Sequence, residues 1–259
     1  MVLPEEIQIA ARECNITAVR AWLESGADPN DTDSRGRTPL NILVHGGFIS
    51  ESDDHLDVAR LLLSHGADVN CAAVDGFNPL HCCTVFPEDS PRGSLIQLFL
   101  DAGVNVNAMT RDEETPLGMT LACSIWSGPD AARSCLDVVT RLLRAGATLD
   151  AIHRDNDSIH ESAEDMLRDD EASFRRLPPD FYACKALISD YRAAGSSWKS
   201  YVRAPPKELL RLRSLIARGR AREKVRTLSR TPPEIAFLFA PKFPNELFWK
   251  VATYWNPRS

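Results

Sequence analysis

The chain has 259 residues, of which 44% are hydrophobic and 25% charged, a composition typical of a folded globular protein. The first residues, MVLPEEIQIA, place acids where a secretory leader needs basic residues, and no apolar stretch is long enough to span a membrane. We therefore expect no membrane contact and a cytoplasmic location, with the nucleus as the alternative compartment.

Residues 4–32 form the first predicted unit, two short helices that end in the string WLESGADPN at 22–30. Similar strings recur three times, as LLLSHGADVN (61–70), FLDAGVNVN (99–107) and LLRAGATLD (142–150). In the second copy an apolar helix ends at Gly66, which allows a left-handed backbone, and Asp68 and Asn70 can bond locally to the backbone. The four glycines are separated by 40, 37 and 43 residues, which indicates one structural unit used four times.

A second string alternates with the first and reads RGRTPLNIL (35–43), DGFNPLHCC (75–83) and DEETPLGMT (112–120). Its threonine suits a helix N-cap, and its proline suits the first helical position, where no N–H is needed. The leucine after each proline is expected to point into the interface with the next unit; these leucines are Leu40, Leu80 and Leu117. The third copy has Glu113 where the others have Gly36 and Gly76, so a different or strained turn is expected there.

The two alternating strings resemble the ankyrin repeat, whose signature D-x-x-G-x-T-P-L-H-x-A is followed by G-A-D-V-N. The resemblance covers about residues 4–167 and implies an all-α fold, a solenoid of helix-turn-helix repeats joined by β-hairpin-like turns, with a C-terminal helical cap. We assign residues 1–195 to this domain, with about four to five repeats. Three inserts, at 46–54, 86–93 and 126–132, are expected as loops between the two helices of their units, and they form either a binding edge or a tolerated surface.

The stack is expected to end in the string DNDSIHESAEDML at 155–167. There Asn156 takes the glycine position of the signature and Ser158 is expected to cap the next helix. Residues 169–180 are predicted as a loop, and residues 181–194 as the last helix of the stack.

Residues 196–259 are predicted to form a basic helix followed by a capping or docking segment. Residues 199–230 hold eleven basic side chains and two acids, but neither an interleaved aromatic face nor zinc-finger spacing accompanies them. A helix that packs on the last repeat is therefore preferred, and nucleic acid is not the expected partner. The string FPNELFWKVATYW (243–255) resembles the start of an F-box, in which Leu247, Trp249 and Trp255 would dock a second protein; the alternative is a capping helix.

No catalytic residue, metal site or cofactor is expected, so the chain is not predicted to be an enzyme. Phosphate-loop, zinc-protease and nucleophile-elbow motifs are missing from the sequence. The seven cysteines show no C-x-x-C spacing and are predicted to be small buried hydrophobes. His81 occupies the signature histidine position, where capping or packing is expected rather than metal binding.

The ankyrin resemblance implies a non-enzymatic scaffold that binds another protein through its hairpin tips and concave helices. The alternative is a substrate-recruiting adaptor of a ubiquitin ligase, whose component would bind the F-box-like or SOCS-box-like tail. The concave helices are expected to add Val44, Val85 and Ser124. The expected tip contacts are Thr32, Ser34, Arg35, Arg37, Val74, Asp75, Phe77, Met109, Arg111, Asp112, Glu114, Ile152, Arg154 and Asp155.

Overall fold

The computed structural model describes residues 2–45, 54–84, 92–126, 129–150, 153–155, 158–160, 162–173, 177 and 179–203. The chain divides into two compact units, Met1–Arg192 and Ala193–Ser259. Most of the first two predicted inserts and the whole F-box-like tail lie outside the described residues.

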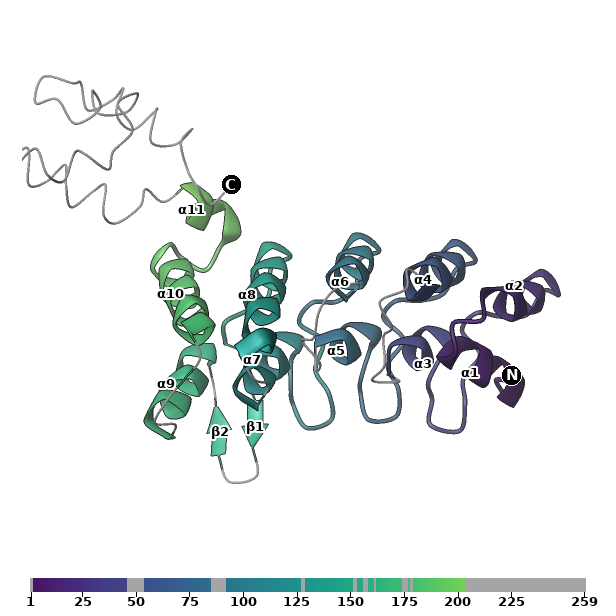
Figure 1. Cartoon of the computed structure of the whole chain (residues 1–259), viewed down its shortest axis with the longest axis horizontal. Coiled ribbons are helices and arrows are strands. Elements are labelled where there is room, and N and C mark those ends of the chain that lie inside the picture. Colours follow the sequence, from purple (N-terminus) through teal and green to yellow (C-terminus); the bar gives the residue numbers. More distant parts are fainter. Residues whose placement is uncertain are drawn as a thin grey trace, which may run out of the picture. The chain divides into compact units, whose positions relative to one another are not determined.

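The first unit consists of helix pairs that lie side by side in two rows, which confirms the predicted stack of helical repeats (Figure 1). The first helices of the pairs are α1 (Glu5–Arg12), α3 (Pro39–His45), α5 (Pro79–Thr84), α7 (Pro116–Trp126) and α9 (Ala163–Ser173). The second helices are α2 (Ile16–Glu24), α4 (Asp54–Ser64), α6 (Arg92–Asp101), α8 (Pro129–Arg144) and α10 (Pro179–Ala193). Between α8 and α9 the antiparallel strands β1 (His153–Asp155) and β2 (Ser158–His160) form a short hairpin.

The starts of α3, α5 and α7 follow the predicted chemistry. Each begins at its proline. The Thr38 hydroxyl accepts from the Asn41 N–H at 3.3 Å, and Thr115 accepts from the Gly118 N–H at 3.2 Å. These bonds satisfy N–H groups that have no partner inside the first turn of a helix.

The second helices end as the glycine strings predict. After α4, Gly66 has φ 90°, and the Ala67 N–H donates to the Leu62 carbonyl at 3.0 Å, the bond typical of a glycine-terminated helix. The carboxylate of Asp68 accepts from the Asn70 N–H at 2.8 Å, which confirms the predicted local turn. This turn directs the chain from the end of α4 toward α5, the first helix of the following pair.

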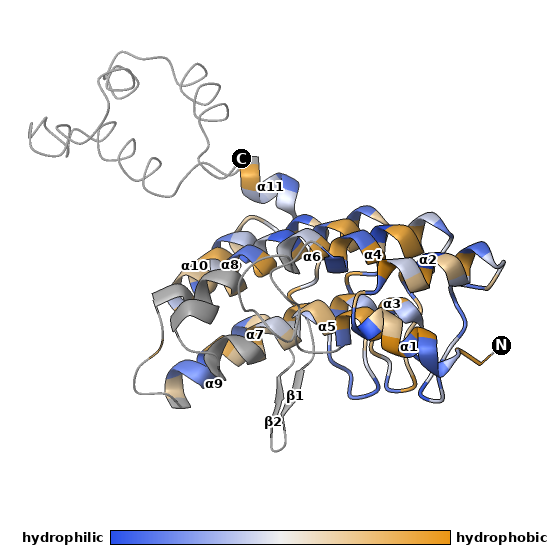
Figure 2. Ribbon diagram, turned by 45° about the vertical axis from the view of Figure 1, so that its right-hand side comes forward, coloured by the Kyte–Doolittle hydropathy of each residue, from blue (hydrophilic) through white to orange (hydrophobic). Residues whose placement is uncertain are grey.

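The core lies between the two rows, and hydrophobic residues are concentrated in the helices while the projecting loops are mostly hydrophilic (Figure 2). The leucines expected between units, Leu40, Leu80 and Leu117, are at most 1% exposed, which confirms their placement. At the N-terminal end Leu3 and Ile7 pack with Ile42, and the Leu3 N–H donates to the Thr32 carbonyl at 2.9 Å.

Three expectations about loops are wrong. The third insert is largely helical, because α7 runs to Trp126 and α8 begins at Pro129. Residues 169–173 of the loop expected at 169–180 are helical instead, because α9 continues to Ser173. Helix α9 begins at Ala163 rather than after Ser158, because Ser162 is the cap: its hydroxyl accepts from the Asp165 N–H at 3.2 Å and donates to the Asp165 carboxylate at 2.7 Å.

The described part of the second unit contains helix α11 (Trp198–Arg203). Within it the rings of Trp198 and Tyr201 lie 5.1 Å apart between centroids. Of all the helices in the described residues, none combines the length and the apolar character that crossing a membrane requires.

Candidate functional site

Four loops connect the second helix of one pair to the first helix of the following pair. They project on the same side of the first unit (Figure 1). We call them finger 1 (residues 31–38), finger 2 (71–78), finger 3 (108–115) and finger 4 (151–162). The predicted hairpin tips lie in these fingers.

Fingers 1 to 3 fold with the same turn. Two backbone bonds close finger 1, from the Asp33 N–H to the Arg37 carbonyl and from the Gly36 N–H to the Asp33 carbonyl, both 3.0 Å. Finger 3 repeats both bonds, although Glu113 stands at the glycine position with φ 63°. Of the two outcomes expected there, the structure has the strained one: the turn is kept, and Glu113 adopts a left-handed backbone that L-residues rarely take.

Backbone bonds also join each finger to the next. The Val74 N–H donates to the Arg35 carbonyl at 2.9 Å, and the Arg111 N–H donates to the Asp75 carbonyl at 2.9 Å. Finger 3 approaches Gly76 so closely that a Cβ atom there would lie 2.8 Å from the Cα of Thr110. Fingers 1 to 3 therefore form one continuous surface with fixed spacing.

The bases of the fingers are held by the residue after the buried leucine. The Asn41 amide donates to the carbonyls of Cys71 and Phe77, each at 3.2 Å. The equivalent His81 is fully buried, and its ring Nε2 lies 3.1 Å from the Ala108 carbonyl. The backbone N–H of His81 donates to the side-chain oxygen of Asn78 at 3.1 Å. Burial lowers the pKa of His81. The expected capping and packing role is confirmed.

A row of asparagines that the sequence analysis did not identify links the turns after the second helices. The Asn30 amide donates to the Gly66 carbonyl at 3.1 Å and its oxygen accepts from the Asp68 N–H at 2.7 Å. Asn70 and Asn107 make the same two bonds to the following repeat. The last residue of the recurring G-A-D-V-N string carried this signal, but the glycine that it contacts lies 33 to 39 residues away.

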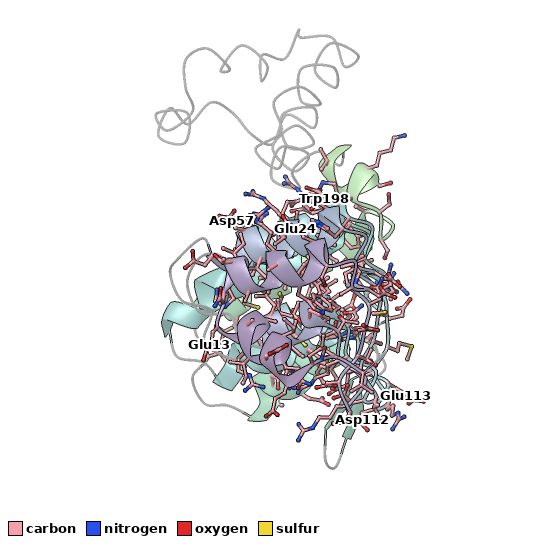
Figure 3. All side chains as sticks on the ribbon, turned by 90° about the vertical axis from the view of Figure 1, so that its right-hand side faces the viewer. Glu13, Glu24, Asp57, Asp112, Glu113 and Trp198 are labelled. Atoms are coloured by element: carbon pink, nitrogen blue, oxygen red, sulfur yellow. The ribbon has the colours of Figure 1, made fainter. Side chains whose placement is uncertain are left out.

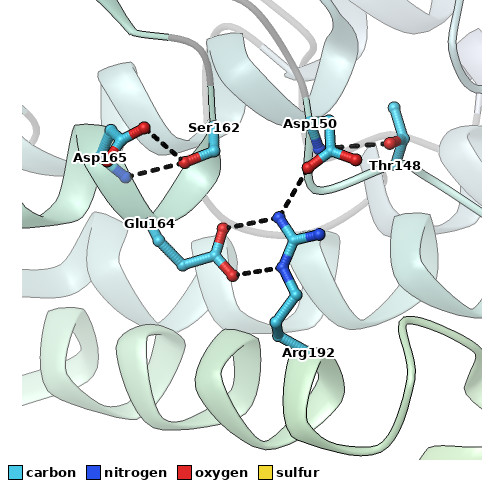
Figure 4. A network of polar contacts seen from close by, with 6 residues as sticks. All are labelled: Thr148, Asp150, Ser162, Glu164, Asp165 and Arg192. Carbon is cyan, nitrogen blue, oxygen red and sulfur yellow. Dashed lines mark hydrogen bonds and ion pairs between the residues drawn. The ribbon is translucent and has the colours of Figure 1, made fainter.

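The row ends at the fourth copy, where Asp150 replaces asparagine and contacts a cation instead (Figure 4). The Arg192 guanidinium donates to Asp150 at 2.7 Å and to both carboxylate oxygens of Glu164, at 2.7 and 3.0 Å. These carboxylates raise the pKa of Arg192 further above its usual range. The last repeat is thus held at this edge by ion pairs.

Most of the predicted tip residues in fingers 1 to 3 are exposed. Val74 is 52% and Met109 48% exposed, on neighbouring fingers. Asp112 and the adjacent Glu113 lie at the tip side of the unit, away from Glu24 and Asp57 of the second helices (Figure 3). The other exposed tip residues are Ser34, Arg35, Asp75 and Arg111.

Two predicted tip residues also have structural roles within the fingers. Arg37 donates to Asp33 through Nε at 2.8 Å and forms an ion pair with the same carboxylate. Burial alone would raise the pKa of Asp33, but the bonds from Arg37 and from the Arg35 N–H outweigh it and hold the pKa below its usual value. The Phe77 ring packs 5.7 Å from the ring of His81. Thr32 and Glu114 are half-buried.

Other predicted contacts are less accessible or lie outside the described residues. Val44 is 2% exposed, because α3 turns this side chain into the core, so its assignment to a binding surface is wrong. Ile152, Val85 and the tail residues Leu247, Trp249 and Trp255 lie outside the described residues. Arg154 and Asp155 are placed in β1 by their backbone.

Within the described ranges no group of three or more histidine, cysteine or acidic side chains is arranged to hold a metal ion. Cys82, Cys83, Cys135 and Cys184 are buried, as predicted for small hydrophobes, whereas Cys14 and Cys71 are half-buried.

Helix pairs, proline starts, glycine stops and projecting fingers are the parts of the ankyrin unit, and residues 7–110 match the family model described as Ankyrin repeats (3 copies). This part of the chain consists of ankyrin repeats. The ankyrin stack of the structure extends beyond the matched residues, because α7 to α10 continue both rows. Ankyrin repeats are in general protein–protein interaction modules rather than enzymes.

Three relatives illustrate the range of similar proteins. An ankyrin repeat protein of Rickettsia felis is 42% identical over 60 residues, which are 23% of this chain and 26% of the relative. Cyclin-dependent kinase 4 inhibitor B of Bos taurus is 43% identical over 63 residues, 24% of this chain and 42% of the relative. Ankyrin repeat domain-containing protein M-T5 of Myxoma virus is 25% identical over 146 residues, 56% of this chain and 28% of the relative. The matched parts span less than half of each relative.

Proposed function

We propose that the ankyrin stack is a non-enzymatic binding module whose partner is a protein that docks on the tips of fingers 1 to 3. The observation that carries the proposal is the pair of backbone bonds between neighbouring fingers, Val74 to Arg35 and Arg111 to Asp75. These bonds hold exposed side chains of three repeats at fixed spacing. A partner then finds a preorganised surface and loses less affinity to ordering it.

The chemistry of the tips defines the kind of partner. Finger 1 presents the cation Arg35, and finger 2 presents Asp75. Finger 3 presents Asp112 and Glu113 beside the cation Arg111, so acidic groups outnumber basic ones there. The exposed side chains of Val74 and Met109 lie on fingers 2 and 3. The matching surface carries an apolar segment, an acidic group toward finger 1 and basic groups toward fingers 2 and 3. Charge placed in this order selects the orientation of the partner as well as its identity.

The relatives named as inhibitors of cyclin-dependent kinase 4 make a protein kinase one specific candidate. The similarity covers 63 residues, 24% of this chain, and it supports protein binding by the ankyrin repeats. Direct measurement has to identify the partner. Purified cyclin-dependent kinase 4 is the first protein to test for binding to the full chain.

Charge reversal at the tips tests the proposal. Proteins that co-purify with the full chain are compared with those recovered by the double variant Arg35→Glu, Asp112→Lys and by the control Glu24→Lys, which reverses an exposed charge away from the tips (Figure 3). We expect at least one partner to be lost from the double variant and kept by the control. Equal recovery of every partner by all three proteins contradicts a binding surface at the tips.

The proposal that the tail recruits a ubiquitin ligase rests on the F-box resemblance of residues 243–255 alone. Deletion of residues 242–259 separates it from a capping role. A docking segment requires the loss of one partner with an unchanged melting temperature, whereas a capping segment requires a lower melting temperature.

A further inference from the structure

Two buried thiols meet at the boundary between the fourth and fifth repeats. The Sγ atom of Cys184 on α10 lies 3.9 Å from the Sγ atom of Cys135 on α8, and the side chains are 2% and 1% exposed. Helices α8 and α10 are neighbours in the row of second helices (Figure 1). A disulfide has an S–S length of about 2.05 Å, so closing this pair requires an approach of roughly 2 Å.

The other described sulfur contacts have different partners. Cys82 Sγ lies 3.7 Å from His45 Nδ1, and Cys71 Sγ lies 3.8 Å from the Asp68 carboxylate. Burial raises the pKa of Cys82 to about 12, and burial together with Asp68 raises the pKa of Cys71. In these two contacts the partner is a histidine or a carboxylate rather than a second thiol, so neither contact can close into a disulfide.

The boundary that contains the thiol pair is joined differently from those before it. Asparagine side chains link the earlier repeats through bonds to backbone, but here the side-chain contact across the boundary is the ion pair of Arg192 with Asp150. Glu164, the other partner of Arg192, belongs to the same repeat as Arg192. The Asp150 side chain is 71% exposed, and exposed ion pairs contribute little to stability. Arg192 and Cys184 lie on the same helix, α10, so a small displacement of this helix moves both.

We propose that Cys135 and Cys184 form a peroxide-sensitive thiol pair that closes into a disulfide and locks the last ankyrin repeat to the stack. The reacting co-substrate is a hydroperoxide. Because both thiols are buried, the reaction follows transient opening of the boundary between the fourth and fifth repeats, since regions of low local stability separate first.

The chemistry balances with one hydrogen peroxide. One thiolate attacks a peroxide oxygen, so that an S–O bond forms, the O–O bond breaks, and a sulfenic acid and water result. The second thiolate attacks the sulfenic sulfur, the S–S bond forms, and the hydroxide leaves as water after taking a proton. Two thiols and one peroxide therefore give one disulfide and two waters.

Peptide mapping of the unmutated full chain tests the proposal directly. After treatment with hydrogen peroxide the remaining thiols are blocked with N-ethylmaleimide, and the protein is digested with trypsin without reduction. Trypsin releases residues 134–141 and 177–185, each of which contains one of the two cysteines and no other. We expect these peptides joined, with two hydrogens fewer than their sum, and separated again by dithiothreitol. Recovery of both as maleimide adducts or sulfinic acids, while other cysteines oxidise, overturns the proposal.

Two variants test the lock and the opening step. In Cys184→Ala the joined peptide must disappear, and peroxide must no longer slow tryptic cleavage after Lys185 and Arg192; slowing that persists in this variant would show that the disulfide is not the lock. Arg192→Gln removes the ion pair with Asp150 that crosses the boundary, and we expect the disulfide to form several-fold faster at the same peroxide concentration. An unchanged rate contradicts opening at this boundary.

Discussion

The side-chain amide of Asn70 donates to the carbonyl oxygen of Gly103 at 3.3 Å, across the boundary between two repeats. Its oxygen accepts from the Asn105 N–H at 2.7 Å, so one side chain binds a donor and an acceptor of the same turn. The amide of asparagine offers both groups, whereas the carboxylate of aspartate accepts but does not donate.

Replacement of Asn70 by Asp is expected to lower the free energy of unfolding by about 0.5–1.5 kcal/mol, because the exposed Gly103 carbonyl loses its donor and faces a carboxylate. The matched control is Asn105→Asp. The side-chain oxygen of Asn105 accepts from the Asn107 N–H at 3.1 Å. The carboxylate of Asp68 makes the same bond in the preceding repeat, so an aspartate can replace Asn105 in this role. Urea denaturation of both variants decides the point; equal losses would contradict the two-bond role of Asn70.

Truncation of Leu80 tests the packing between repeats. Leu80 is completely buried at the start of α5, so Leu80→Ala should cost about 2–5 kcal/mol of unfolding free energy. Val74→Ala, at a side chain that is 52% exposed, should stay within about 0.5 kcal/mol. Denaturant titration followed by circular dichroism measures both changes, and a loss below about 1 kcal/mol for Leu80→Ala would place that side chain outside the core.

Substitution of Gly76 separates backbone strain from close approach. Gly76→Ala combines a φ of 87° with a Cβ that would lie 2.8 Å from the Thr110 Cα, so finger 3 must move. Gly26→Ala has a similar φ, 85°, and open space around the added Cβ. We expect about 1–2 kcal/mol of destabilisation at Gly26 from strain alone and a larger loss at Gly76. Similar melting temperatures for the two variants would show that the fingers are not held in contact.

Glu113→Gly is expected to stabilise the stack by about 1 kcal/mol, because glycine adopts the observed φ of 63° without a steric penalty. The control is Asp112→Gly. It also removes an acidic side chain, but at a neighbouring residue whose backbone φ is not positive. A higher melting temperature for Glu113→Gly alone would confirm that finger 3 carries strain, and a lower one would refute it.

The lowered pKa of the buried His81 predicts that the stability of the fold depends on pH in the mildly acidic range. Burial holds its pKa below the ordinary 6.5, so the unfolded chain takes up a proton before the folded chain does. Stability should therefore fall as the pH is lowered through 6.5 toward the folded-state pKa.

The matched variant is His81→Asn, because Asn41 occupies the equivalent position and also bonds to the base of the next finger. The variant should be less stable at pH 7, where it loses the packing of the ring, but its stability should fall less between pH 7 and pH 5. Parallel curves of unfolding free energy against pH for the two proteins would assign the dependence to other groups.

Local chemistry made the start and stop of each helix predictable. Thr38 with Pro39, and Gly66 with Asp68, act on backbone groups within five residues, so their roles follow from neighbouring letters. Fold class and the burial of the three interface leucines follow from the same local patterns.

Longer-range relationships were not predictable in this way. The contact of Asn30 with Gly66 spans 36 residues, and that of Arg192 with Asp150 spans 42, so the neighbouring residues do not identify the partner in either case. The start of α9 is expected too early in the sequence because finger 4 is longer than the other fingers. The pair Ser162 and Asp165, three residues apart, was a recognisable capping signal for the correct start. Exposure of the tips was predictable for Arg35, but the ion pair that occupies Arg37 depends on the turn that folds Asp33 back on it.

The row of asparagines has a direction, because each side chain reaches from its own repeat into the one that follows. During synthesis on a ribosome, the asparagine needed to receive a new repeat is therefore already present when that repeat emerges. Ordering can proceed from the N-terminus without waiting for the complete chain, and at every intermediate length a single edge is left for the next repeat to cover.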